Sequence, residues 1–344
     1  RSNLVGNMTT FLDTTEPQFV TRADWIPDFW NFLLGLNKDD LIAELVQNDL
    51  DQQASRTVIT FEQERLISEG NGKPVDANGW WRLQMIRGAG DQVPAKKGKI
   101  GVKNHGLKTA FTIGDQIHLF SAGKTITQTL YATGQNNPPR PGASAKPRPS
   151  PDAPVEGCRV VIDFRKRDLE PREGEAVTIR SVDSNLIDEL FTSACTTIPE
   201  QFAGVVSPEV APRYEIILRH WRLGEVHYLF SCSRPRKVGK KMEMFRRKCA
   251  VSGTIDPLPA SLEEEATRRL VVLTGRLRER VPDFFQRGNR FFVEVSWRVN
   301  RRGTPLQGTG RFRYPIGYPP SDESLTGPGV FFNAPFVSAP ERHG

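Results

Sequence analysis

Three polar residues in the segment 39–53 have the types and the spacing to do chemistry. In DDLIAELVQNDLDQQ, Glu44, Asn48 and Asp51 lie four and three positions apart, among apolar residues that recur at helical spacing. At about 100° per residue in an α-helix, the three side chains fall within about 60° of one another. A carboxylate there could polarise an attacking water while an amide oxygen binds Mg²⁺, which is the chemistry of phosphate hydrolysis.

Glycine-rich segments follow this helix and suit a phosphate group. Residues 68–72 are SEGNG, and residues 94–106 are PAKKGKIGVKNHG, directly before a second helix predicted at 107–111. Glycines let the backbone adopt positive φ and approach phosphates closely, and a helix N-terminus offers free N–H groups to an anion. The residues that this interpretation places around the phosphates are Gly98, Gly101, Lys103, Gly106, Leu107 and Lys108.

The order of these parts resembles the GHKL, or Bergerat-fold, ATPases, which include DNA gyrase, the mismatch-repair protein MutL, the heat-shock-ninety chaperones, the MORC ATPases and the histidine kinases. The resemblance covers about residues 38–165, and ELVQN is similar to the N-box of the family. It implies that Glu44 is the general base for water, that Asn48 is the Mg²⁺ ligand and that Asp51 lines the pocket.

Two further motifs of the family have counterparts here, each with one substitution. Ser68 stands where the D-x-G-x-G motif has the Asp that receives the adenine amino group, with Glu69 next to it. Gly70 and Gly72 match the glycines that make room for the base. Cys158 follows a glycine where the family has a Gly-Thr pair on a late strand. A Ser hydroxyl can still accept a hydrogen bond, but it lacks the charge of a carboxylate.

The resemblance implies an α/β (α+β) fold, namely a two-layer Bergerat sandwich of one mixed sheet covered on one face by helices, followed by a second α/β domain. It also implies ATP and Mg²⁺ as cofactors, and a homodimer that forms on ATP binding. Hydrolysis would be slow, because such proteins use nucleotide to time closure of a lid and to switch the second domain.

Composition along the chain predicts the domain limits. We expect an N-terminal extension at 1–37, the nucleotide-binding domain at 38–195, a second domain at 200–320 and a C-terminal tail at 321–344. Residues 134–156 contain seven prolines and little apolar bulk, so they are predicted to be an extended insertion within the first domain.

Hydrophobic periodicity predicts the secondary structure. Strands are expected where apolar and polar residues alternate, at 56–63, 115–122, 124–132, 157–165, 214–231 with a turn near Gly224, 291–299 and 310–316. Helical spacing predicts helices at 39–53, 79–91 and 261–281, besides the one at 107–111.

The net charge of +7 is concentrated in one segment. Residues 213–248 hold eleven Lys and Arg against three Glu, a surplus of eight. Clustered cations fit the phosphates of nucleic acid or an acidic partner protein, and both remain open. In several GHKL relatives a lysine of the second domain reaches the γ-phosphate, and Lys237, Lys240 and Lys241 are the candidates here.

The sequence predicts a cytoplasmic protein without a membrane span. It has no run of 18 apolar residues and no signal-peptide pattern at its start. Its four cysteines lie far apart without a C-x-x-C pair, which suits packing in a reducing compartment rather than a zinc site or disulfides.

The main alternative is a nucleotide-sensing scaffold or protein-interaction module that does not hydrolyse. The substitutions at Ser68 and Cys158 favour it, whereas Glu44 and Asn48 disfavour it, because a pure binder has no need of a general base. A histidine kinase is less favoured since the residues before 38 contain no His. A DNA-associated or defence ATPase is compatible with the basic segment.

Overall fold

The computed structural model describes residues 38, 40–83, 106–131, 140–143, 147–169, 179–208, 211–238, 242–260, 262–273, 286–287, 290–300, 302, 304–307, 309–313, 325–328 and 330–333. These residues cluster into two compact units. The described residues within Arg1–Leu45, Ile59–Pro94 and Lys103–Leu190 form the first unit, and those within Val46–Val58 and Phe191–Gly344 form the second. The boundary falls inside two helices and one strand, namely α3 (Asp40–Asp51), α5 (Ser184–Gln201) and β1 (Arg56–Phe61).

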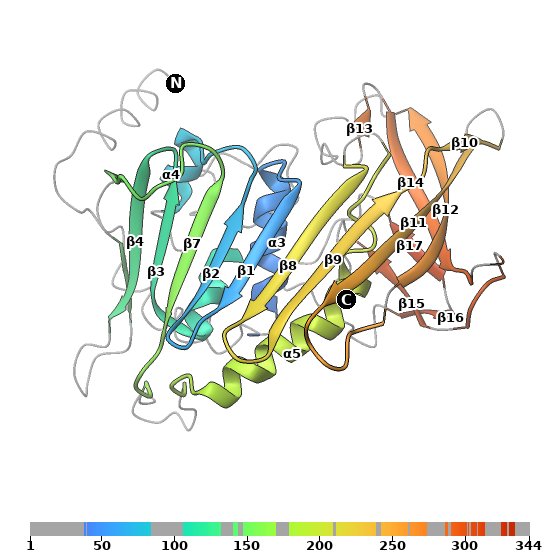
Figure 1. Cartoon of the computed structure of the whole chain (residues 1–344). Coiled ribbons are helices and arrows are strands. Elements are labelled where there is room, and N and C mark those ends of the chain that lie inside the picture. Colours follow the sequence, from blue (N-terminus) through green and yellow to red (C-terminus); the bar gives the residue numbers. More distant parts are fainter. Residues whose placement is uncertain are drawn as a thin grey trace, which may run out of the picture. The chain divides into compact units, whose positions relative to one another are not determined.

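The first unit contains an antiparallel sheet with the spatial order β2–β7–β3–β4 (Figure 1). Its strands are β2 (Arg65–Gly70), β7 (Cys158–Phe164), β3 (Gly114–Ser121) and β4 (Lys124–Tyr131), with β5 (Arg140–Ala143) and β6 (Arg148–Pro149) along β4. Alternation along β7 buries Val160, Ile162 and Phe164, and leaves Arg159 and Asp163 on the other face. The strands predicted at 56–63, 115–122, 124–132 and 157–165 are confirmed.

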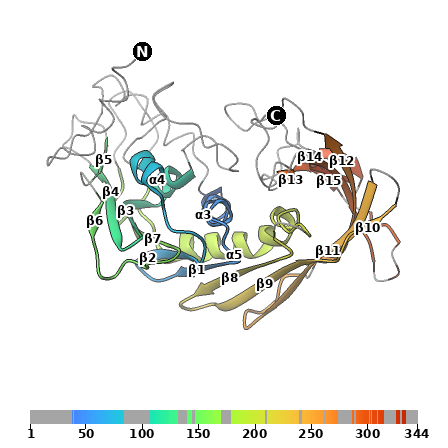
Figure 2. The ribbon, with the colours of Figure 1, turned by 90° about the horizontal axis from the view of Figure 1, so that it is seen from above.

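Helices cover one face of this sheet. Figure 2 shows α4 (Ala77–Leu83) over the sheet. Gln128, on the buried face of β4, donates a hydrogen bond to the Leu83 carbonyl at the end of α4. The predicted helix at 107–111 is present as a 3₁₀ helix, η2 (Gly106–Thr112), and its Ala110 and Phe111 are fully buried. The first unit therefore has two layers, with helices on the face that the strand alternation makes apolar.

Local sequence explains two of the chain reversals. After α3, Gln53 adopts a positive φ of 61°, and the Gln53 and Ala54 amides donate to the Leu50 and Asp49 carbonyls. This is the Schellman arrangement that ends many helices. Between β3 and β4, Ala122 and Gly123 both have positive φ, as the favoured two-residue hairpin loop requires.

The second unit is built mainly from strands. Its antiparallel neighbours follow the order β8–β9–β11–β12–β14–β17, and β15 is parallel to β17. The bounds are β8 (Arg213–His220), β9 (Gly224–Cys232), β10 (Arg236–Lys237), β11 (Met242–Gly253), β12 (Leu262–Leu273), β13 (Gln286–Arg287), β14 (Arg290–Arg298), β15 (Thr309–Arg313), β16 (Leu325–Pro328) and β17 (Val330–Asn333). The strands predicted at 214–231, 291–299 and 310–316 are confirmed.

The helix predicted at 261–281 is wrong, because its described part is strand β12. Its Leu, Glu, Ala and Arg residues are strong helix formers, but β12 is hydrogen-bonded to β11 on one side and to β14 on the other. Pairing on both edges outweighs a helix preference of a few tenths of a kcal/mol per residue. Helix α5 and strand β11 were not predicted.

The predicted α+β class is confirmed. Helices and strands are both present, and the strands form antiparallel pairs together with the parallel β15–β17 pair, so the sheet is mixed. Among the described residues, no helix has the length and apolar character needed to cross a bilayer.

Candidate functional site

Helix α3, which carries the predicted catalytic residues, is enclosed along its length. None of its residues is exposed. One face is the apolar core, where Leu41, Leu45 and Val46 are buried, but Glu44 on the opposite side is also only 7% exposed. Asn48 and Asp51 are half-buried. A solvated helix surface would leave these side chains in water, so the polar stripe is part of the protein interior.

Gln47 belongs to the same polar stripe and was not predicted. It lies three residues after Glu44, so the two side chains share a face of the helix. Gln47 is 4% exposed, and its Nε2 has no hydrogen-bond partner. An unsatisfied buried amide costs about 1–3 kcal/mol, so buried polar groups usually have a partner. Such a group is suited to a ligand or a bound water.

Asp49, also not predicted, occupies the middle of the apolar face of α3. Within the second unit the Thr57 hydroxyl donates to Asp49 Oδ2 at 2.6 Å, and Tyr214 Oη lies 2.6 Å from the same hydroxyl. Since the Thr57 proton is directed at Asp49, the Tyr214 hydroxyl donates to Thr57. Burial raises the pKa of Asp49 to about 7 and raises that of Tyr214 well above its usual value. These two hydrogen bonds connect α3 to β1 and β8, and they hold the helix at the residue next to Asn48.

The adenine-side motifs predicted at 68–72 and 157–158 come together in the first unit. In the antiparallel register Gly70 faces Cys158, and Cys158 faces Ser121 on β3. Ser68 is 3% exposed and lies on the buried face of β2, two residues before Gly70, whereas Glu69 points to the opposite, exposed face. The strand period therefore directs Ser68 and Gly70 to the side that the helices cover, and it directs Glu69 away from that side.

Gly157 makes this junction tight. Its φ is +79°, and a Cβ atom there would lie 2.3 Å from the carbonyl oxygen of Gly70. Ser121 donates to the Gly157 carbonyl at 2.5 Å and accepts from the Val75 amide at 3.0 Å. Only glycine fits between β7 and the end of β2, so the close approach of these backbones depends on Gly157.

The predicted glycine-rich lid is described only at its end. The predicted phosphate contacts Gly98, Gly101 and Lys103 lie outside the described residues. Gly106 and the half-buried Leu107 begin η2, and the side chain of Lys108 is outside the described part. Gly72 is half-buried in the turn that follows β2.

Arg165 holds the other end of η2 and was also not predicted. This fully buried guanidinium donates to Asp115 Oδ1 at 2.8 Å and to the carbonyls of Phe111, Thr112 and Gly114. Burial lowers the pKa of Arg165, and the ion pair with Asp115 opposes that shift. The carbonyls at the end of η2 are thereby satisfied, and the helix is anchored to the end of β7.

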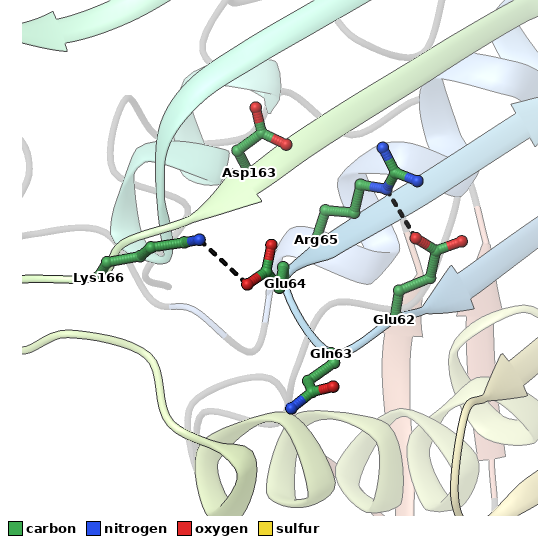
Figure 3. A pocket seen from close by; sticks show the side chains of 6 residues that line it. All are labelled: Glu62, Gln63, Glu64, Arg65, Asp163 and Lys166. Atoms are coloured by element: carbon green, nitrogen blue, oxygen red, sulfur yellow. Dashed lines mark hydrogen bonds and ion pairs between the residues drawn. The ribbon is translucent and has the colours of Figure 1, made fainter.

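A separate polar pocket opens at the β1–β2 turn of the first unit. Its volume is about 500 Å³, and Figure 3 shows the residues that line it, which are Glu62, Gln63, Glu64, Arg65, Asp163 and Lys166. Arg65 pairs with Glu62 at 2.6 Å, and Lys166 pairs with Glu64 at 3.1 Å. The cations are thus already neutralised by carboxylates, and a phosphate would meet further negative charge. This pocket includes none of the predicted nucleotide motifs.

Metal ligation was predicted for a single amide, that of Asn48. Within the ranges that the structure describes, no group of three or more His, Cys, Asp or Glu side chains could hold a metal ion. The four cysteines are free thiols. Burial raises the pKa of Cys195 to about 11 and that of Cys249 to about 12, as expected for packing residues rather than metal ligands.

Comparison with known proteins adds little to this geometry. No protein-family model matches the sequence, and no curated protein matches it. Among solved structures, the N-terminal domain of a DNA repair protein aligns with 62% of this chain and 67% of its own, at a TM-score of 0.30 and 9% sequence identity. A likeness of that size carries no argument about fold or function.

Proposed function

We propose that this chain is a Mg²⁺-dependent ATP-binding protein of the GHKL type in which Glu44 supports slow hydrolysis. The observation that carries the proposal is the enclosed polar stripe of α3. A carboxylate that is 7% exposed and an amide that is 4% exposed, with its Nε2 unpartnered, share one face of a helix that is otherwise packed in the core. An enclosed amide such as that of Gln47, whose Nε2 lacks an internal partner, is expected where a polar ligand completes the site.

Glu44, Asn48 and Gln47 each have a role in the proposal, and Asp51 lines the pocket beside them. Glu44 accepts the proton of the attacking water, and its enclosure keeps bulk water from competing. Asn48, one turn further on, offers an amide oxygen to Mg²⁺; one protein ligand suffices, because this ion keeps several waters and bridges nucleotide phosphates. When bound, Mg²⁺ would supply charge neutralisation at the phosphates. Gln47 would donate its free N–H to the nucleotide or to an ordered water.

The junction of β2 and β7 supports the base-binding part of the proposal. Gly157 lets the backbones of β7 and the end of β2 approach closely where the two motifs meet, and Ser68 lies on the buried face of β2. A neutral hydroxyl gives a weaker hydrogen bond to the adenine amino group than a carboxylate does. We therefore expect modest affinity and incomplete discrimination between ATP and GTP. Dimerisation on ATP, which the resemblance implies, and the cytoplasmic location expected from the sequence belong to the same proposal.

A non-hydrolysing nucleotide sensor is the second candidate, and the neutral Ser68 favours it. The two candidates share a binding site and differ only in the use of Glu44. The decisive comparison is therefore between binding and turnover in the same variants.

The test measures Mg²⁺-dependent ATP binding by calorimetry and phosphate release over hours. The proteins are the wild type, Glu44→Gln, Asn48→Ala and the control Gln52→Ala, which lies just beyond α3. The proposal expects slow turnover by the wild type and the control, binding without turnover by Glu44→Gln, and loss of the Mg²⁺ dependence in Asn48→Ala. Binding without turnover by the wild type would establish the sensor instead, and no binding of ATP in the presence of Mg²⁺ would refute both candidates.

A further inference from the structure

The basic segment 213–248 divides into cations that the fold uses and cations that it leaves exposed. Arg247 is buried and paired with Glu294 at 2.7 Å, and Arg219 pairs with Glu225. By contrast Arg213, Arg236 and Lys248 are exposed, and none of the three forms an ion pair with any described residue. The positive charge that remains without a carboxylate partner is therefore carried by fewer Lys and Arg side chains than the eleven counted in the sequence.

Arg213, Arg236 and Lys248 lie on one face of the second unit. The register places Arg213 of β8 opposite Ser231 of β9, and Ser231 opposite Lys248 of β11, so the three form a row across the sheet. Figure 1 shows β8, β9 and β11 side by side. Neighbouring strands lie about 4.8 Å apart, so the two charges of this row are separated by about 10 Å.

The same face continues along β11. Arg246 lies two residues before Lys248 and is exposed; its backbone amide donates to the Ser233 hydroxyl and its carbonyl accepts from the Ser233 amide. A further two residues along, Met244 faces Arg236 of β10. Alternate residues of a strand point to one face at intervals of about 6.8 Å. That interval is about twice the axial phosphate spacing of 3.4 Å along one strand of a duplex.

We propose that this face, made by Arg213, Arg236, Arg246 and Lys248, binds the phosphate backbone of double-stranded nucleic acid without reading its sequence. Guanidinium groups bind phosphate oxygens through two N–H bonds, and serine hydroxyls such as those of Ser231 and Ser233 commonly donate to phosphates as well. On the opposite, buried face of the sheet, Arg247 of β11 donates to Glu294 of β14.

The chemistry of the face favours a duplex over the other polyanions. A protein partner normally requires an apolar centre that excludes charge. The described side chains of the row and of the β10–β11 edge named above are Arg, Lys and Ser with the half-buried Met244, and Glu215, Leu229 and Ala250 form the next row of the same face. Single strands are held by stacking of bases on aromatic rings, and no described side chain of this face is aromatic. Contacts limited to phosphates leave base identity unread.

The experiment measures binding of a fluorescent 24-base-pair DNA duplex by anisotropy, without nucleotide, between about 50 and 200 mM salt. The test variant is Arg213→Ser/Arg236→Ser/Lys248→Ser. The control is Lys124→Ser/Arg148→Ser/Arg167→Ser, which removes three exposed cations of the first unit and changes the net charge equally. Circular dichroism and thermal unfolding confirm that both triple variants are folded.

With four phosphate contacts, the slope of log K against log salt should be about −3.6 for the wild type and the control. The test variant should lose about 2.7 of that slope and more than about tenfold of its affinity at low salt. Duplex RNA of equal length shows whether the helix form matters, since the proposal holds for either duplex. Equal binding by the two triple variants would overturn the proposal, as would preferential binding of single-stranded DNA or of a poly-glutamate peptide.

Discussion

Replacing Arg247 by methionine tests whether the second unit depends on its buried ion pair. Arg247 on β11 donates to Glu294 on β14 at 2.7 Å, to the Thr267 hydroxyl on β12 at 2.9 Å and to the Val206 carbonyl at 2.8 Å. The two charged side chains are 2% and 6% exposed. Arg247→Met leaves a buried carboxylate without its counter-charge, which typically costs about 3–5 kcal/mol.

The double variant Arg247→Met/Glu294→Met removes both charges and isolates the electrostatic part. The Thr267 hydroxyl and the Val206 carbonyl still lose a partner, at a cost of about 1–3 kcal/mol. The added apolar contacts of two methionines offset part of that loss, because replacing a buried pair by apolar residues is often neutral or stabilising. We therefore expect the double variant to be at least about 2 kcal/mol more stable than Arg247→Met alone.

The assay is urea unfolding of the wild type, the two single variants and the double variant, followed by circular dichroism. The coupling free energy is the stability change of the double variant minus the sum of the two single changes. If the changes add within about 0.5 kcal/mol, the pair is not coupled and the buried ion pair does not hold β11 to β14.

Two further predictions concern single residues. Burial raises the folded-state pKa of Asp49 from 3.8 to about 7. Between about pH 4 and 7 the folded state therefore keeps a proton that the unfolded chain has released. The stability that the neutral carboxyl contributes is lost as the pH rises through that window. The free energy of unfolding of Asp49→Asn, relative to that of the wild type, should therefore rise from pH 4 to 8 by up to about 4 kcal/mol. Urea unfolding at pH 5, 6 and 8 measures this difference, and a constant difference across these pH values would disprove the raised pKa. Gly157→Ala should cost more than about 2 kcal/mol, because its Cβ would meet a backbone oxygen at 2.3 Å, whereas Gly123→Ala, with a positive φ but open space, should cost about 1 kcal/mol in the same thermal unfolding assay. Equal costs at the two glycines would show that φ alone matters.

Much of the first unit could be predicted from sequence, because its signals are local. The period of α3 and the alternation of β3, β4 and β7 depend on residues within one element, and each element formed where its pattern predicted. Strand alternation also places Ser68 on the buried face of β2 and Glu69 on the exposed face. This placement follows from the period of two along β2.

The candidate site was predicted only in part. The stripe of Glu44, Asn48 and Asp51 was recognised by spacing, but Gln47 was overlooked although it shares their face. Asp49 was overlooked because a carboxyl group in the middle of an apolar helix face is stable only with a hydrogen-bond partner, and that partner, the Thr57 hydroxyl, lies on another element. A helical wheel would have placed Asp49 among Leu45 and Val46, and that conflict was the available sign of a buried polar contact.

By itself, the sequence determined α3 and several strands, among them β3, β4 and β7, together with the order of the glycine-rich motifs and the concentration of positive charge. Tertiary structure alone decided that 262–273 pairs as a strand, that Gly70 lies beside Cys158, and that Arg247 is an internal ion-pair partner while Lys248 remains at the surface. The physical reason is the sequence separation between interacting residues. Periodicity reports which face of an element is buried, whereas strand neighbours and charge partners are chosen among residues tens of positions away, and one-dimensional patterns do not record that choice.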